Sequence, residues 1–290
     1  MSLPQVQQDC IKLDDGVEVF FRHAGDPHAP VFLLLHGMPS SSFQYRNLIP
    51  ILASKFRVIA PDLPGFGFTK TPEDYKFTFE HLSRSTERFI DALHLSTKPF
   101  PVYIFDYGAP VALRILSRRP DVFSTIITQN GNVYEAGLAP AWEEFGIRRY
   151  WREPTQINRN SLRDLLSLAN TEYQYTHGHP DPASIPPETF HLDHFLAVSR
   201  TDAMLDLLGD YRTNVELYPT FQNALRIASK EHSLRVLAIW GRHDPFFLPE
   251  GAEAYKNDVA DTFVEILDAG HFALESHLDV IAKRILDLAQ

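Results

Sequence analysis

The chain of 290 residues is 44% hydrophobic and carries a formal net charge of -10 at pH 7. This acidic balance, without a long basic run, disfavours nucleic-acid and anionic-membrane partners, while the apolar content is sufficient for a large core. The single cysteine, Cys10, cannot form an internal disulfide, and residues 1–10 are polar, unlike a signal peptide. We expect a soluble cytoplasmic protein, a monomer or a homodimer.

Short runs rich in apolar, β-branched and aromatic residues recur along the chain and predict strands. The first two runs flank an acidic turn at residues 14–16, of the kind that closes a β-hairpin. Several later runs are continuously apolar, as is typical of strands that are buried on both faces of a sheet. The expected strands are Ile11–Leu13, Glu18–Arg22, Val31–Leu35, Phe56–Ala60, Pro101–Phe105, Phe123–Gln129, Val236–Trp240 and Thr262–Leu267.

Segments with apolar residues at helical spacing alternate with these strands. We expect helices at Arg46–Ser54, at about Phe79–Leu93, in the segment that follows Gly108, and at about Leu278–Leu288. Alternating strands and helices predict an α/β protein with a mostly parallel sheet and helices on both of its faces.

The alternation is interrupted after residue 132, where strong strand runs are lacking for about 80 residues. Helical patterns at Leu162–Ala169 and Leu192–Leu208 flank a loop, Thr176–Pro187, that contains Pro and His. We interpret this region as a helical cap over the carboxyl edge of the sheet, where such sheets bind ligands. The expected organisation is a core in two parts, residues 1–132 and 213–290, with a cap at residues 133–212.

Asp106 follows one predicted strand directly and precedes a predicted helix that starts with the small residues Gly108 and Ala109. Small residues allow a sharp turn from strand to helix, which presents the Asp side chain at the carboxyl edge of the sheet beside helix-start N–H groups. An Asp at such a place can also be a simple helix N-cap. The rest of the chain favours the catalytic interpretation.

Two further residues, Asp244 and His271, lie just past the carboxyl ends of the last two predicted strands. Each has an ordinary alternative, as a turn residue or at a helix start. The order of nucleophile, acid and histidine at three strand ends resembles the α/β-hydrolase fold, whose catalytic triad runs in that order. Loops at residues 36–39 and 62–67 resemble that superfamily as well, and the resemblance covers nearly the whole chain. Within the first loop, we expect His36 to bond to loop backbone.

Asp106 occupies the position at which this superfamily usually carries Ser, and an aromatic residue and Gly follow it. This pattern is similar to epoxide hydrolases and haloalkane dehalogenases. A carboxylate that attacks a saturated carbon leaves an ester, which water can cleave, whereas a serine would leave an ether. The resemblance implies that His271, oriented by Asp244, activates water, and that the backbone N–H groups of Met38 and Tyr107 hold the oxyanion.

The leaving group distinguishes the two families. Haloalkane dehalogenases typically hold the halide with a Trp after the nucleophile and often an Asn after His-Gly, whereas this sequence has Tyr107 and Met38 there. Epoxide hydrolases use cap tyrosines that polarise and protonate the epoxide oxygen. Tyr211 lies in a segment similar to one that carries such a tyrosine, and Tyr150 is a candidate partner; a packed side chain is the alternative for each. Other cap candidates are Tyr134, Tyr173 and Tyr175.

We therefore expect a hydrolase that acts at an alkyl carbon through an aspartyl ester, without a cofactor. Epoxide hydrolysis to a vicinal diol is the leading hypothesis, and hydrolysis of a carbon–halogen bond is the alternative. The substrate would be a small apolar organic molecule, with water as the second reactant. A non-catalytic small-molecule binding protein on this fold is the alternative of another class. The segment that contains His177, His179, His191 and His194 is Pro-rich, and we expect an exposed segment there and no metal site.

Overall fold

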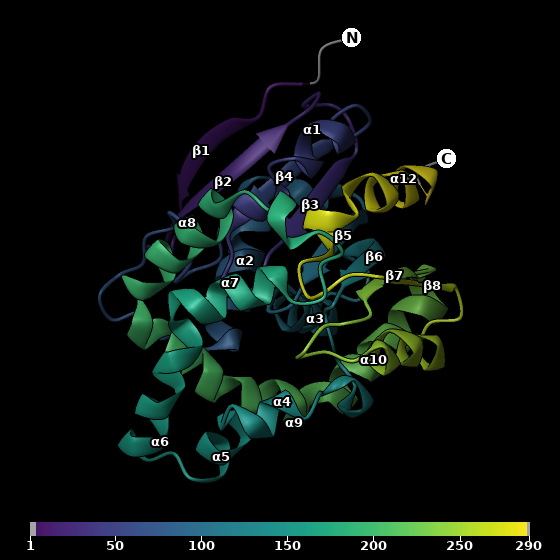
Figure 1. Cartoon of the computed structure of the whole chain (residues 1–290). Coiled ribbons are helices and arrows are strands. Elements are labelled where there is room, and N and C mark those ends of the chain that lie inside the picture. Colours follow the sequence, from purple (N-terminus) through teal and green to yellow (C-terminus); the bar gives the residue numbers. More distant parts are fainter. Residues whose placement is uncertain (1–3, 289–290) are drawn as a thin grey trace.

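Eight strands form one sheet in the computed structural model, which describes residues 4–288 (Figure 1). They are β1 (Gln7–Lys12), β2 (Glu18–Ala24), β3 (Val31–Leu35), β4 (Arg57–Pro61), β5 (Phe100–Phe105), β6 (Phe123–Gln129), β7 (Arg235–Gly241) and β8 (Thr262–Leu267). Their order is β1-β2-β4-β3-β5-β6-β7-β8. Strands β1 and β2 are antiparallel to their neighbours, and β3 to β8 are parallel. The predicted mostly parallel sheet is confirmed.

Alternate residues of a strand point to opposite faces of the sheet, and both faces are buried. In β5, Val102 and Ile104 belong to one core cluster, whereas Tyr103 and Phe105 belong to the other. Helices contribute to both clusters, so both faces of the sheet are covered, as the alternation of strands and helices predicts. The first face is covered by α2 (Phe79–Ala92) and α3 (Gly108–Arg118), and the second by α1 (Leu48–Leu52) and α12 (Leu278–Leu288).

Between β6 and β7, the described chain contains helices and no strand (Figure 1, teal and green). Most of their apolar residues join the first core cluster, and α9 packs on α2 and α3, whereas Tyr175, Ile185 and Phe190 join the second cluster. None of the helices in the described part of the chain is long and apolar enough to cross a membrane. The inserted helices are η3 (Glu135–Gly137), α4 (Ala141–Glu144), α5 (Ile147–Arg152), α6 (Gln156–Ser161), η4 (Leu162–Leu166), α7 (Leu168–Thr176), η5 (Pro182–Ser184), α8 (Pro187–Val198) and α9 (Thr201–His232).

The predicted helix over Arg46–Ser54 is shorter in the structure, because only residues 48–52 are α-helical and a 3-10 turn precedes them. In an α-helix that began at Arg46, the ring of Pro50 would clash with the Arg46 carbonyl. Short helices also connect the strands elsewhere. They are η1 (Ser42–Tyr45), η2 (Leu95–Thr97), α10 (Pro249–Ala254), η6 (Tyr255–Asn257) and α11 (Ala273–Ser276).

The helical pattern predicted at Leu192–Leu208 is divided between α8 and α9. Arg200, between them, has non-helical backbone angles, and its guanidinium donates to the carbonyl of Gly67, 2.6 Å away, in a loop of the core. This tertiary contact interrupts the helical run. Helix α9 then continues to His232 through Pro219, so the cap boundary expected at residue 212 falls inside a continuous helix.

Candidate active site

Asp106 lies at the turn between β5 and α3, with a positive φ of 45° that is uncommon for a residue other than Gly. The turn is tightly packed on both sides. A Cβ on Gly108 would lie 2.3 Å from the Leu35 carbonyl oxygen, and one on Gly37 would lie 2.2 Å from Asp106 Oδ1. The small residues that predicted a sharp turn are therefore required for two loops to approach the nucleophile candidate.

The backbone N–H of Met38 donates to Asp106 Oδ1 at 2.7 Å. Burial raises the pKa of Asp106 to about 6, against the opposing effects of the His271 charge and of the Met38 and Tyr107 N–H groups. One oxygen of the carboxylate is thus held by an N–H group of the predicted oxyanion hole, and Oδ2 remains the candidate nucleophilic atom.

His36 fixes the loop that carries Met38. Its Nδ1 lies 3.0 Å from the Gly37 carbonyl oxygen, and its Nε2 accepts from the Leu63 N–H at 2.9 Å. Burial lowers the pKa of this imidazole, which favours its neutral form. The expected backbone-bonding role of His36 is confirmed.

His271 and Asp244 form a buried pair, with His271 Nδ1 2.7 Å from Asp244 Oδ2. Asp244 also accepts from Asn130 Nδ2 on Oδ2 at 2.6 Å and from the Phe246 N–H on Oδ1 at 2.7 Å. Burial opposes a charge on His271, but the charge and hydrogen bond of Asp244, together with the charge of Asp106, raise the pKa of this imidazole. The geometry can hold an imidazole in one orientation as a base.

Asp106 and His271 line one narrow cavity between the sheet and the cap, with a solvent-accessible volume of about 40 Å³. A volume of this size admits water or a very small ligand, since a single water needs about 10–15 Å³ on this measure. Most of the wall is apolar or aromatic, and Gln174 of α7 is its polar side chain from the cap. The other lining residues are Met38, Tyr107, Trp142, Ile147, Leu165, Leu208, Phe246 and Phe247.

Tyr211 is fully buried on α9, three residues after Leu208, and does not itself line this cavity. Its ring centroid lies 5.7 Å from that of Tyr107 and 4.6 Å from that of Trp142, so it lies behind two residues of the cavity wall. Its hydroxyl makes no hydrogen bond of good geometry among the described residues, although the Tyr218 hydroxyl lies near it. Burial, followed by the neighbouring Tyr218 hydroxyl and the Asp106 charge, raises the pKa of Tyr211 well above its usual value.

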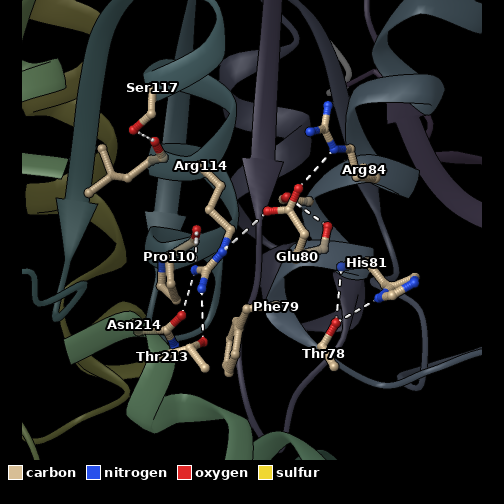
Figure 2. A network of polar contacts seen from close by, with 12 residues as sticks. Thr78, Phe79, Glu80, His81, Arg84, Pro110, Arg114, Ser117, Thr213 and Asn214 are labelled. Atoms are coloured by element: carbon tan, nitrogen blue, oxygen red, sulfur yellow. Dashed lines mark hydrogen bonds and ion pairs between the residues drawn. The ribbon is translucent and has the colours of Figure 1, made fainter. Parts of the chain in front are cut away.

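Helix α9 is fixed against the helix that follows the nucleophile candidate (Figure 2). Arg114 of α3 donates to Asn214 Oδ1 and, at 3.0 Å, to Thr213 Oγ1, both on α9. Its guanidinium carbon also lies 5.7 Å from the ring centroid of Phe79 and 5.4 Å from that of Phe221. These contacts join the backbone that positions Asp106 to the helix that carries Tyr211.

The structure does not bring Tyr150 to the cavity. Its side chain lines a separate outer groove and packs against α9, where a Cβ on Gly209 would lie 2.8 Å from Tyr150 Cε1. The other cap tyrosines do not line the cavity either. Tyr134 and Tyr175 donate to Asp258 and Asp193, respectively, and Tyr173 is partly exposed.

Asn130, Trp142 and Gln174 are site residues that were not predicted from the sequence. Asn130 directly follows β6, and this position at a strand end could have indicated a site residue. Besides donating to Asp244, Asn130 accepts from the Gly241 N–H at 3.0 Å. Trp142 and Gln174 lie in the cap, where no strand end indicates which side chains face the cavity.

Comparison with known proteins places these features in a family. The family model of the alpha/beta hydrolase fold matches residues 30–278. An uncharacterized hydrolase of Saccharomyces cerevisiae is 44% identical over 285 residues, which are 96% of this chain and 95% of that protein. Haloalkane dehalogenase 2 of Mycobacterium tuberculosis is 26% identical over 268 residues, 89% of this chain and 87% of that protein.

A laboratory-evolved variant of potato epoxide hydrolase has a similar structure, with a TM-score of 0.77. The similarity covers 99% of both chains at 19% sequence identity. A likeness at this level of identity concerns the fold alone.

Proposed function

The chain belongs to the α/β-hydrolase fold family, and on this premise we propose that it hydrolyses epoxides to vicinal diols through an ester on Asp106. The observation that carries the proposal is a buried carboxylate with one oxygen held by the Met38 N–H, in the same cavity as the His271–Asp244 pair. A carboxylate nucleophile is suited to substitution at a saturated carbon, because its product is an ester that water can cleave.

In the first half of the reaction, Asp106 Oδ2 forms a bond to one carbon of the epoxide ring. The bond between that carbon and the ring oxygen breaks, and its electron pair stays on the oxygen. An acid protonates this oxygen, which becomes a hydroxyl group of the bound substrate. Because Met38 holds Oδ1, Oδ2 is already oriented for the attack.

In the second half, water attacks the carboxyl carbon of the Asp106 ester while His271 takes one of its protons. The N–H groups of Met38 and Tyr107 stabilise the oxyanion on Oδ1. Collapse of this intermediate breaks the bond between the carboxyl carbon and Oδ2. Oδ2 receives the proton from His271 and leaves as the second hydroxyl of the diol, while the oxygen of the attacking water remains in the Asp106 carboxyl group. The resulting carboxylic acid returns its proton to the acid that was used in the first half.

The lack of a free indole donor on the cavity wall favours an epoxide over a haloalkane as the substrate. An indole N–H at the nucleophile-adjacent position is absent because Tyr107 stands there, and the N–H of Trp142 donates to the Phe246 carbonyl at 2.9 Å. A departing halide would therefore find no free indole donor on the described cavity wall. An epoxide oxygen stays attached to the substrate and needs a proton instead.

We assign the proton donor in this proposal to Tyr211. Its hydroxyl is buried beside that of Tyr218, and the charge of Asp106 is among the influences that raise its pKa. A phenol with a raised pKa remains protonated at neutral pH and can protonate an alkoxide, which is a stronger base. Since Tyr107 and Trp142 stand in front of Tyr211, these rings must shift when the substrate fills the cavity.

The proposal is tested with the His271→Gln variant, which keeps the nucleophile and removes the base. Incubation with a panel of epoxides and haloalkanes, followed by intact-protein mass spectrometry, should show an adduct with the full mass of the epoxide. Peptide mapping should place this adduct on Asp106. The matched control, His271→Gln combined with Asp106→Asn, should form no adduct.

Two other outcomes would contradict the proposal. An adduct that forms only from haloalkanes, and lacks the halogen, would indicate a dehalogenase. Absence of an adduct from either class, together with recovery of every compound unchanged from wild-type protein, would favour a binding protein on this fold.

A further inference from the structure

Gln174 is a buried amide in an otherwise mostly apolar part of the cavity wall. It is 7% exposed, lies on α7 and lines the cavity together with Asp106 and His271. Within residues 4–288, its side-chain amide makes no hydrogen bond, and its polar atoms are not among the fully enclosed atoms without a partner, which is consistent with an amide that faces the cavity. An amide that faces a cavity can take a partner from whatever fills the cavity. A partner that arrives with the substrate would satisfy this group.

The neighbouring residue holds Gln174 in place. Tyr175 stacks on Phe272, the residue after His271, with ring centroids 3.8 Å apart, and its hydroxyl donates to Asp193 of α8 at 2.5 Å. These contacts fix the last turn of α7 over the loop that carries His271. The backbone position of Gln174 is therefore fixed by the same contacts that align the cap with the base.

The other polar groups of the cavity wall are already engaged or enclosed. The Met38 N–H donates to Asp106, and the Trp142 N–H donates to the Phe246 carbonyl. The Tyr107 hydroxyl has no partner, but its oxygen is fully enclosed by protein atoms. Gln174 is thus the cap side chain in the described structure that presents an unused polar group to the cavity.

We propose that Gln174 donates a hydrogen bond to the epoxide oxygen and stabilises the negative charge that develops there when the ring opens. This inference rests on the proposed function and adds a catalytic residue to it. An amide has no proton to give up, so Gln174 does not replace the acid. It acts in the first half of the reaction alone, because the charge of the second half develops on the Asp106 carboxyl oxygen, at the Met38 N–H.

The test compares both half-reactions in wild type and in Gln174→Met, which keeps the length of the side chain and removes its polar atoms. Single turnovers with propylene oxide and styrene oxide, quenched and followed by intact-protein mass spectrometry, give the rates of ester formation and ester hydrolysis separately. Ester formation should slow about 100- to 1,000-fold, as for the loss of one donor to a developing oxyanion. Ester hydrolysis should stay within about threefold of wild type.

A second variant and a control guard against trivial effects. Gln174→Glu keeps the shape of the side chain, but its carboxylate cannot donate and adds a charge near the developing alkoxide, so ester formation should slow at least as much. The control is Gln156→Met, the same substitution at an exposed glutamine of α6 that does not line the cavity, and it should leave both rates within about threefold.

Failure of the inference and failure of the proposed function give different results. Equal rates of ester formation in wild type and Gln174→Met would overturn the role of Gln174 and leave the epoxide hydrolase proposal intact. Equal slowing of both half-reactions would indicate a structural role and overturn the inference as well. If wild-type protein forms no ester with any epoxide, the proposed function is overturned, and the role of Gln174 with it.

Discussion

The raised pKa of the nucleophile makes a quantitative prediction about activity. Burial raises the pKa of Asp106 from 3.8 to about 6, because its charged form is disfavoured away from water. The rise corresponds to about 3 kcal/mol of destabilisation of the carboxylate relative to the acid. A destabilised carboxylate is a stronger nucleophile, but only its ionised form can attack, so activity must fall as acid protonates it.

The expected size of the loss follows from the pKa. With a pKa of about 6, about 9% of Asp106 is ionised at pH 5 and about 91% at pH 7, so kcat/KM for an epoxide should fall about tenfold between these values. An Asp with an ordinary pKa would be about 93% ionised at pH 5 and would lose almost nothing.

The assay is diol formation from styrene oxide between pH 4.5 and 8, corrected for the uncatalysed opening of the epoxide in acid. The charge of His271 lowers the pKa of Asp106. In His271→Gln, the acid limb of ester formation should therefore move to higher pH. A limb with its midpoint below about pH 5 in wild type would refute the reasoning, as would a shift to lower pH in the variant.

Three further predictions concern the groups that support the site. Asn130→Gly removes a hydrogen-bond donor to the buried Asp244, and glycine suits the positive φ of 51° at this position. The variant should lower kcat/KM about 10- to 150-fold. A loss under threefold would contradict the role of Asn130. Arg114→Met leaves Asn214 without its partner and should lower the free energy of unfolding in urea by about 2–4 kcal/mol, whereas a change under about 1 kcal/mol would contradict the link between α3 and α9. Burial raises the pKa of Asp193 to about 8, so the folded state keeps a proton that the unfolded state loses above about pH 4, and stability should fall by up to about 1.4 kcal/mol per pH unit between about pH 5 and 8. Thermal unfolding of Asp193→Asn should show a weaker pH dependence than wild type over this range, and an unchanged dependence would contradict the prediction.

The sequence predicted the core of the site because parallel strands bring distant residues to one edge. Asp106, Asp244 and His271 each follow a strand, and β5, β6, β7 and β8 are neighbours in the sheet. Their adjacency therefore follows from strand order and needs no knowledge of side-chain packing. Asn130 follows β6 in the same way, but an amide at a strand end has many ordinary uses, so its contact with Asp244 became evident only in the structure.

The cap was less predictable because its contacts join segments with no fixed spacing in the sequence. A proline usually ends a helix, yet α9 continues through Pro219 and packs on α3. Arg200 interrupts a run with good helical spacing because it bonds to a core loop. For the same reason, neither the distance of Tyr150 from the cavity nor the position of Gln174 inside it could be read from a pattern along the chain.

The two titrating groups of the site are coupled through the proposed reaction. In the free protein, the charge of Asp106 is one of the influences that raise the pKa of His271, and a raised pKa favours the imidazolium form, which cannot accept a proton. Formation of the ester removes the charge of Asp106 and, with it, this contribution to the pKa. The pKa of His271 therefore falls at the stage that requires a neutral imidazole. Because both groups are buried, little water screens this effect. The burial that makes Asp106 reactive thus also prepares His271 for the hydrolysis that follows.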